Sequence, residues 1–190
     1  MLSKGHKYDV TTNIFEKLDG IVFFDKNDIE NEEDEYVGIY GLLKTVRCEK
    51  YIKRSYIKAP DNFMKWKIFL PKSNGSGALG EVLSTPVIRQ PAIGHTQSFI
   101  SIGSLNTEYE AKALLKYIKT KFSRTMLGIL KVTQDNKKSV WKYVPLQDFT
   151  QNSDIDWSKS VHEIDLQLYR KYGLDDKEIE FIETHVKEMA

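Results

Sequence analysis

The sequence predicts an α+β fold: a curved or barrel-like, mostly antiparallel sheet with helices packed on one side and a helical pair at the C-terminal end. Three observations lead to this prediction. Short segments of strand composition outnumber helical ones until the last third of the chain. A capped amphipathic helix begins near residue 107, and two more helical patterns follow residue 160. We therefore divide the 190 residues into a main domain, 1–150, and a helical extension packed on it, 151–190.

The first third of the chain is predicted to form strands. Gly20–Asp25 and Tyr36–Leu42 are apolar and flank an acidic loop, which makes them a candidate hairpin. Arg47–Lys58 alternates loosely between aromatic and basic residues and is a candidate strand with one basic, solvated face. Trp66–Pro71 is a short candidate for a buried strand, and the Gly/Ser-rich segment 72–80 predicts a loop after it.

The middle of the chain adds further strand candidates. Val87–Arg89 and Ser98–Ile102 are predicted strands on either side of a segment rich in turn residues. A polar stretch, 133–138, is typical of a turn. Ser139–Val144 is then predicted as an aromatic strand that stops at Pro145, because proline cannot donate a ladder hydrogen bond.

Three helices are predicted. Thr107 and Glu110 fit a capping box, in which each side chain accepts a hydrogen bond from the other residue's amide; Asn106 is the alternative cap. An apolar stripe with three- and four-residue spacing then runs to residue 122. Val161–Tyr172 and Asp175–Lys187 have helical patterns, and the second begins with a capping aspartate and further acidic residues.

Charge is sorted along the chain although the net charge is only +1. Residues 25–35 carry seven acidic residues and one lysine, and residues 148–190 carry eleven acidic residues against five basic ones. Residues 44–72 hold nine Lys/Arg against two acids, and residues 112–142 hold nine against one. Two basic segments between acidic ones predict a polarised molecule whose basic face attracts polyanions, although a solvated lysine-rich surface is the plain alternative.

Composition excludes several classes of protein. Cys48 is the only cysteine, so the chain has neither a disulfide framework nor a cysteine zinc site. No apolar run approaches the roughly 18 residues of a membrane span. The N-terminal ten residues lack the apolar segment of a secretory signal. We therefore expect a cytoplasmic protein without membrane contact.

Catalytic motifs are weak. Gly75, Gly77 and Gly80 spell Gly-x-Gly-x-x-Gly, but the segment after them contains Pro86 and is predicted to be extended, so a flexible loop is favoured over a phosphate site. Asp175–Lys177 resembles the tail of a nuclease motif, but acidic residues are expected at a helix start. No histidine has a second histidine at metal-ligand spacing; the four are His6, His95, His162 and His185. The sequence thus predicts no catalytic residues, no metal site and no cofactor in this chain.

The order of segments supplies a resemblance. Its most specific pieces are Tyr143–Phe149 and Tyr169–Leu174, which follow the strands, the glycine-rich loop and the basic helix described above. Over residues 36–183 the chain resembles the C-terminal region of bacterial N6-adenine DNA methyltransferases of type II restriction–modification systems, including fused restriction–modification enzymes. It is more distantly similar to the target-recognition domains of type I specificity subunits.

That resemblance implies a function. In such enzymes a separate methyltransferase domain binds S-adenosylmethionine and methylates a flipped adenine, and the C-terminal domain reads the DNA sequence. This chain lacks the Asn/Asp-Pro-Pro-Tyr loop and the methyl-donor glycine motif. The resemblance therefore implies the recognition half alone, as a fragment or a separate subunit. Its expected partners are double-stranded DNA and a methyltransferase domain in the same or a companion chain.

DNA-binding residues are predicted from charge and loop position. Lysine and arginine fix a protein on the phosphate backbone, whereas Arg, Asn and Gln read base edges in the major groove. We single out Arg54 and Arg89 as the strongest candidates. The full set is Arg47, Lys50, Lys53, Arg54, Lys58, Lys72, Arg89, Gln90, His95, Gln97, Lys137 and Lys138.

Two other functions stay open. The acidic loop 25–35 and the acidic C-terminal helices are candidates for docking a methyltransferase domain or another subunit, which would make the chain a protein-interaction module without direct base readout. The second open alternative is a nuclease whose catalytic residues form no recognisable motif in the sequence.

Overall fold

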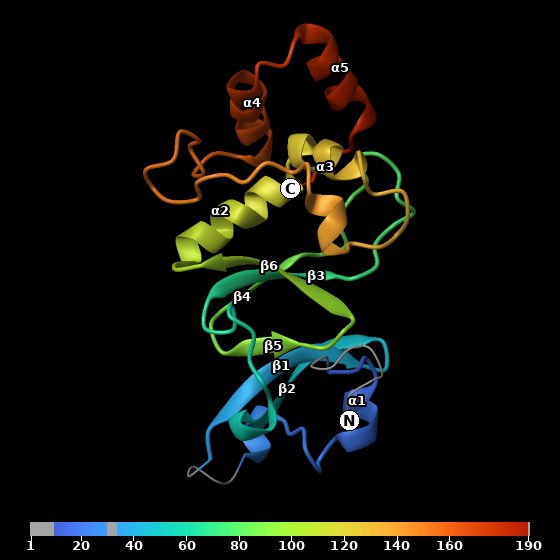
Figure 1. Cartoon of the computed structure of the whole chain (residues 1–190), viewed down its shortest axis with the longest axis vertical. Helices are drawn as coiled ribbons and strands as arrows, with labels where there is room; N and C mark the ends of the chain where they lie inside the picture. The colour runs from blue at the N-terminus through green and yellow to red at the C-terminus, as the bar shows by residue number, and fades with distance from the viewer. Residues whose placement is uncertain (1–9, 30–33, 190) are drawn as a thin grey trace.

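The structure, a computed structural model, describes residues 10–29 and 34–189. Figure 1 shows two three-stranded sheets stacked one above the other, with α1 at the N-terminal end and α2 to α5 beyond the second sheet. The described residues form no closed barrel. The predicted α+β class is confirmed: the sheets are mostly antiparallel, and the larger helices lie on one side.

The N-terminal sheet has the order β2-β1-β5. Strands β1 (Tyr36–Leu43) and β2 (Val46–Lys53) form an antiparallel hairpin, and the turn between them places Lys44 at φ 55°. Strand β5 (Ile93–His95) runs parallel to β1. The hairpin predicted between residues 20–25 and 36–42 is wrong, because β1 pairs with the next segment along the chain. Residues 20–25 form a turn, where Phe24 makes an isolated bridge to Tyr51.

Short helical segments complete the N-terminal part. They are α1 (Ile14–Leu18), the 3-10 turn η1 (Lys26–Asp28) and the 3-10 turn η2 (Arg54–Tyr56). Phe15 from α1 and Phe23 pack edge to face, with ring centroids 5.1 Å apart. These rings close a small core under the sheet, which is separate from the core of the helical half.

The second sheet has the order β4-β3-β6 and is antiparallel. Its strands are β3 (Trp66–Pro71), β4 (Val87–Arg89) and β6 (Phe99–Leu105). The predicted strands at 66–71 and 87–89 are confirmed, and the strand predicted at 98–102 extends to residue 105. Strand β5 was missed, because its three residues lie in a segment rich in turn residues.

Aromatic side chains join the two sheets. Tyr40, Phe69, Ile93 and Phe99 form a buried cluster between them, with the Tyr40 and Phe99 ring centroids 4.8 Å apart. The chain crosses back from β5 to β6 through residues 96–98 only. This layer of rings is therefore one of the contacts that hold the two sheets together.

Helix α2 (Glu108–Lys119) covers the outer face of the second sheet, and α3 (Lys121–Gly128) packs against α2 and the C-terminal helices. The Thr107–Glu110 capping box is confirmed, and Thr107 is the cap. The predicted helix breaks earlier than its apolar stripe suggests, because Thr120 turns to ψ 148° and caps α3 through its hydroxyl. The strand predicted at 139–144 is wrong, since these residues include the 3-10 turn η3 (Lys138–Trp141).

The C-terminal helices belong to the main core. Helix α4 (Val161–Tyr172) has the predicted bounds, and α5 (Asp176–His185) begins after the predicted cap, Asp175. Leu168 from α4 and Ile182 from α5 share one buried cluster with residues of β3 and α2. Helices α4 and α5 are therefore packed on the rest of the chain through a common hydrophobic core.

Candidate nucleic-acid interface

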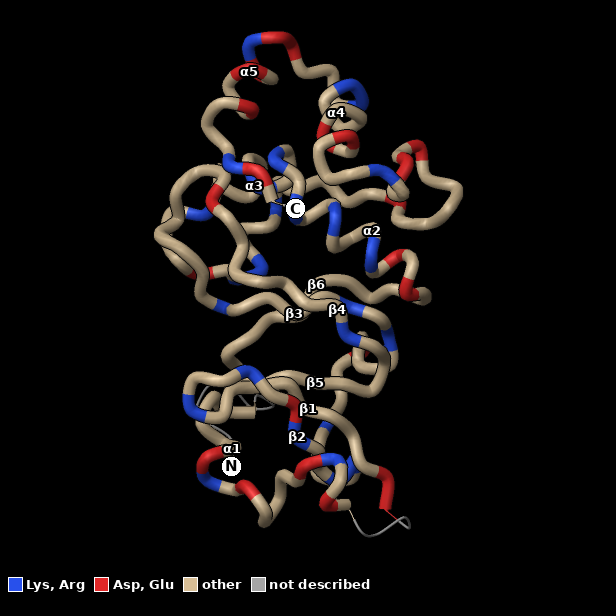
Figure 2. Tube along the Cα trace, turned by 180° about the vertical axis from the view of Figure 1, so that it is seen from behind, with Lys and Arg blue, Asp and Glu red and all other residues tan. Residues whose placement is uncertain are grey.

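The two basic segments do not form a single basic lobe. Figure 2 shows basic and acidic positions interspersed along the whole trace. Some basic side chains of these segments face inward, and in the described structure they satisfy internal partners. Those classed as buried are Lys50, Lys67, Lys121, Arg124 and Lys131.

Lys50 forms ion pairs with two acidic residues of the N-terminal part. Its ammonium lies 2.9 Å from the Asp19 carboxylate and 3.0 Å from that of Asp25. Burial alone would lower the pKa of Lys50, but its hydrogen bonds to the two carboxylates raise it. Lys53 lies 2.6 Å from Asp34, and this ion pair raises the pKa of Lys53. The acidic residues around the hairpin thus neutralise two of the predicted DNA contacts.

Lys67 is buried without a carboxylate partner among the described residues. It donates to the carbonyl oxygens of Phe63, at 2.9 Å, and Lys65, at 2.8 Å. Burial lowers the pKa of Lys67 to about 8. Its role is to hold the loop before β3, and its charge does not reach the surface.

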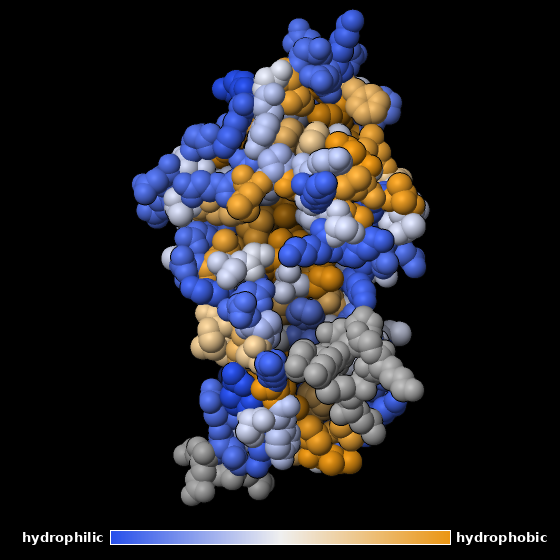
Figure 3. All heavy atoms as spheres, in the orientation of Figure 1, coloured by the Kyte–Doolittle hydropathy of each residue, from blue (hydrophilic) through white to orange (hydrophobic). Residues whose placement is uncertain are grey.

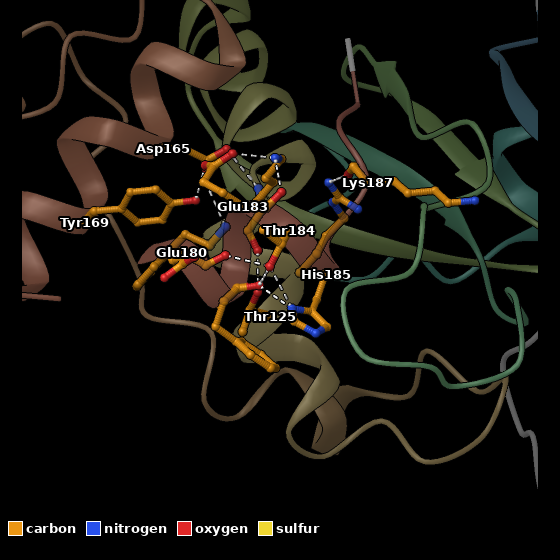
Figure 4. A network of polar contacts seen from close by, with 12 residues as sticks. Thr125, Asp165, Tyr169, Glu180, Glu183, Thr184, His185 and Lys187 are labelled. Atoms are coloured by element: carbon orange, nitrogen blue, oxygen red, sulfur yellow. Dashed lines mark hydrogen bonds and ion pairs between the residues drawn. The ribbon is translucent and has the colours of Figure 1, made fainter. Parts of the chain in front are cut away.

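The basic residues of α3 bind the C-terminal segment (Figure 4). Arg124 donates to the carbonyl oxygens of Gly80 at 2.7 Å and Lys119 at 3.1 Å, and to that of Lys187. Lys121 pairs with Glu183, which also accepts from the Tyr169 hydroxyl at 2.8 Å. These two basic side chains of the second basic segment therefore hold the C-terminal segment against α3.

Asp165 completes that network. Its carboxylate accepts hydrogen bonds from the amides of Lys121 and Phe122, at 2.9 and 2.8 Å, at the N-terminus of α3. Burial raises the pKa of Asp165 to about 6, although the two amide hydrogen bonds act in the opposite direction. The carboxylate is thus an internal helix cap.

Lys131 is bound by the glycine-rich loop. Glu81 pairs with Lys131 and also accepts from the amides of Ser76, at 2.8 Å, and Gly77, at 3.2 Å. Lys131 donates in addition to the Asn74 carbonyl at 2.8 Å. As predicted, no helix follows the loop. The amides that would have to bind a phosphate are already occupied by a carboxylate of the same loop.

A cleft lies between the two sheets, near the turn that joins β1 to β2. Its volume is about 680 Å³. Three predicted residues line it: Arg47 from β2, Lys72 just after β3, and Gln97 just before β6. Arg47 and Lys72 have no carboxylate partner among the described residues. The other lining residues are Thr12, Leu42, Pro71, Ser73, Ser98, Phe99 and Asp135.

Arg47 is held across the cleft. Its Nη1 donates to the Thr85 carbonyl at 3.0 Å, and its guanidinium carbon lies 5.7 Å from the centroid of the Phe99 ring. These contacts join the N-terminal sheet to the second sheet and to the loop before β4. They orient the guanidinium plane at the cleft wall.

Asn136 brings the second basic segment to the same edge. Its amide donates to the Lys72 carbonyl at 2.8 Å, and its side-chain nitrogen donates to the Pro71 carbonyl at 2.9 Å. The next residues, Lys137 and Lys138, are exposed. We define the cleft edge as Arg47, Lys72, Gln97, Lys137 and Lys138. It therefore combines residues from both basic segments.

A second group of predicted residues lies at the opposite end of β2. Six residues of strand separate Arg47 from Lys53, a distance of roughly 20 Å at about 3.3 Å per residue. Arg54 lies 5.4 Å from the Phe63 ring and donates to the Ile57 carbonyl at 3.0 Å. This distal group contains Lys53, Arg54, Lys58, Arg89 and Gln90.

Two residues of the predicted set, Arg89 of the distal group and His95, have internal contacts. Arg89 lies over the Tyr40 ring at 4.2 Å and donates to the Ile88 carbonyl at 3.1 Å, which ties this member of the distal group to the sheet stack. His95 packs edge to face against Phe69 at 4.8 Å, and its Nδ1 lies 2.8 Å from the Thr96 carbonyl. Arg54 and Arg89, singled out from the sequence, thus have structural contacts.

Sequence reasoning missed Asn136, Asp135 and Phe99. Asn136 carries no charge and lies in a predicted turn, so only its three-dimensional contacts show that it positions Lys72. A signal did exist for Phe99. It is the partner of Pro71 in the β3–β6 ladder, so pairing the two predicted strands would have placed Lys72 beside it.

No described group of three or more His, Cys, Asp or Glu side chains could hold a metal ion. In the described part of the chain, no helix has the length and apolar character that crossing a membrane requires. Comparison with protein-family models, with curated proteins and with solved structures found no match to this chain.

Proposed function

We propose that the chain is a recognition module for double-stranded DNA that binds through the cleft edge. One observation carries the proposal. Cations from both basic segments, which are distant in sequence, meet there without carboxylate partners among the described residues, whereas other cations of these segments pair internally. A concentration of unpaired cations at one edge suits a phosphate backbone.

The residues of the cleft edge have two different roles in recognition. Lys72, Lys137 and Lys138 neutralise phosphates and fix the position of the duplex on the edge. Arg47 and Gln97 are suited to base readout, because a guanidinium pairs with guanine and a carboxamide pairs with adenine, each through two hydrogen bonds. Arg47 lies in β2, and Gln97 lies in the short turn between β5 and β6.

The restriction–modification context rests on the resemblance described above. In that setting S-adenosylmethionine binds a separate methyltransferase domain of the same or a companion chain, and this module supplies the sequence reading. The proposal thereby implies a bacterial, cytoplasmic enzyme. Association of the purified chain with the methyltransferase encoded beside it would support this context.

A charge-matched pair of triple variants tests the DNA interface. Lys72→Ala/Lys137→Ala/Lys138→Ala should weaken duplex binding and lower the slope of log K against log [salt] by about two to three, since each phosphate contact contributes about 0.9. The control, Lys26→Ala/Lys159→Ala/Lys177→Ala, removes the same charge elsewhere. Equal salt slopes for the two variants would refute the interface. Gln97→Ala should reduce discrimination between duplex sequences by about 1–3 kcal/mol without changing the slope.

A protein-docking module is the second candidate, and an exposed apolar patch favours it. Leu79, Ile129 and Val132 are 40%, 51% and 81% exposed. The loops that carry them adjoin: a Cβ on Gly128 would meet Leu79 at 2.6 Å, and one on Gly77 would meet the backbone at Val132 at 2.6 Å. Figure 3 shows hydrophobic side chains gathered on this face, beside α3. Exposed patches of this kind mark interaction sites.

The docking candidate has its own test. Ile129→Lys/Val132→Lys should abolish co-purification with the methyltransferase encoded beside the chain while leaving duplex affinity within about twofold. Leu146→Lys, at a separate and 91% exposed leucine, serves as the control. If both variants co-purify equally well, the patch is not the docking surface.

A further inference from the structure

The cleft at the DNA edge has the volume of a small-molecule site. Its volume of about 680 Å³ lies inside the roughly 300–1,000 Å³ that such sites occupy. Leu42, Pro71 and Phe99 provide apolar wall, whereas Lys72 and Asp135 provide charge at the same opening. A surface meant only for the outside of a duplex requires no such hollow.

Charge in the cleft matches a single phosphodiester. Arg47 and Lys72 supply two positive charges, and Asp135 supplies one negative charge, so the lining carries one net positive charge. The Asp135 carboxylate has no cationic partner among the described residues, and the Asp135 amide donates to the Thr133 hydroxyl oxygen at 3.3 Å. The carboxylate is thus available to accept a hydrogen bond from an amino group of a base.

Arg47 offers a flat surface that is already oriented. Its contacts with Thr85 and Phe99 fix the guanidinium at the wall, and only one of its five N–H donors has a partner in the described structure. Guanidinium planes and aromatic rings are the surfaces on which proteins stack unpaired bases. A base that stacks on a protein side chain has left the stack of its own duplex, so the ligand that uses this surface is a base outside the stack.

We infer that the cleft binds one unpaired nucleotide of a DNA strand: its base lies against Arg47, its edge faces Gln97 and Asp135, and its phosphate lies at Lys72. This inference rests on the proposed function, because the strand reaches the cleft from a duplex bound at the edge. It adds a distinct requirement, namely that an extrahelical base strengthens binding. Phosphate contacts alone would not produce that preference.

Matched duplexes test the inference. The first is fully paired, the second carries one extrahelical adenosine, and the third carries an extrahelical abasic nucleotide at the same place, which reproduces the backbone distortion without the base. Fluorescence anisotropy should show about tenfold tighter binding of the second than of the third, since base stacking on protein side chains contributes about 1–3 kcal/mol. Arg47→Lys keeps the charge and loses the plane, so it should reduce the preference for the adenosine duplex over the abasic duplex to less than threefold.

The control variant is Arg170→Lys, an exposed arginine on α4, which should retain the tenfold preference. Equal affinity of the wild-type protein for the adenosine and abasic duplexes would overturn the inference and leave duplex recognition standing. Failure to bind any of the three duplexes would overturn both. A preference that survives Arg47→Lys would also contradict the inference, since the base would then lie elsewhere.

Discussion

Two internal cations, Arg124 and Lys131, and two lysines of the cleft edge, Lys137 and Lys138, come from the same basic segment but differ in exposure. Arg124 and Lys131 are 1% and 2% exposed, whereas Lys137 and Lys138, only a few residues further on, lie at the surface. Composition does not separate them, since all lie in one segment with a single acidic residue. The difference lies in what surrounds each of them.

Internal acceptors explain the contrast. Arg124 lies where three backbone carbonyl groups converge, and Lys131 lies beside a carboxylate that the glycine-rich loop already holds. A buried carbonyl or carboxylate without a donor is unfavourable by about 1–3 kcal/mol or more, so a cation at these places stabilises the fold. At the cleft edge, Lys72 and Lys137 meet no such acceptors in the described part of the chain, which leaves them to an external anion.

The largest effect is expected at Arg124. Arg124→Met should lower the free energy of unfolding by more than about 4 kcal/mol, because it strands the carbonyl groups of Gly80, Lys119 and Lys187 in the interior. Urea unfolding measures it. Arg170→Met, which removes an exposed arginine from α4, is the matched control and should change stability by less than about 0.5 kcal/mol. Similar losses of stability in both variants would show that the internal contacts of Arg124 do not set it apart from an exposed arginine.

The Glu81–Lys131 pair should rank next. Lys131→Met leaves a largely buried carboxylate with only two amide donors, and should destabilise the protein by about 3–4 kcal/mol. Glu81→Gln/Lys131→Met removes both charges and should recover part of that loss. A double-mutant cycle by urea unfolding measures the coupling. Additive losses would show that the pair is not what holds the loop.

The contribution of the buried Asp165 carboxylate to stability is expected to depend on pH. Burial raises its pKa to about 6 from an ordinary value of 3.8, so between these values the folded protein binds a proton that the unfolded chain does not. Its contribution to stability therefore falls as pH rises from about 4 to about 6. The difference in unfolding free energy between wild type and Asp165→Asn should change by roughly 2–3 kcal/mol across this range, since one pKa unit is about 1.4 kcal/mol. A constant difference would contradict the burial argument.

Local signals in the sequence predicted much of the fold. The Thr107–Glu110 capping box, the Trp66–Pro71 strand and the bounds of α4 depend on residues close together in the chain, and the structure confirms them. Pairings at long range were harder to predict. The hairpin partner of β1 was wrong, because residues 20–25 and 46–53 both look like strands and only packing decides between them.

The candidate site was less predictable than the fold. Charge and loop position brought Arg47, Lys72 and Gln97 into the predicted set, and the structure places these three in one cleft. The same criteria also selected Lys50 and His95, whose contacts are internal. Whether a cation meets an acceptor depends on carbonyl groups and carboxylates that lie far away in sequence. The composition of the basic segments does not show where those acceptors are.

The smallest effect on stability is expected at the cleft edge itself. Lys137→Ala and Lys138→Ala, alone or together, should each change the free energy of unfolding by less than about 0.5 kcal/mol, because exposed lysines lose few contacts on truncation. Their effect should appear in duplex binding instead, as a shallower salt dependence. Urea unfolding and anisotropy on the same samples measure both. A stability loss comparable to that of Lys131→Met would place these lysines with the internal cations and leave the edge without its phosphate contacts.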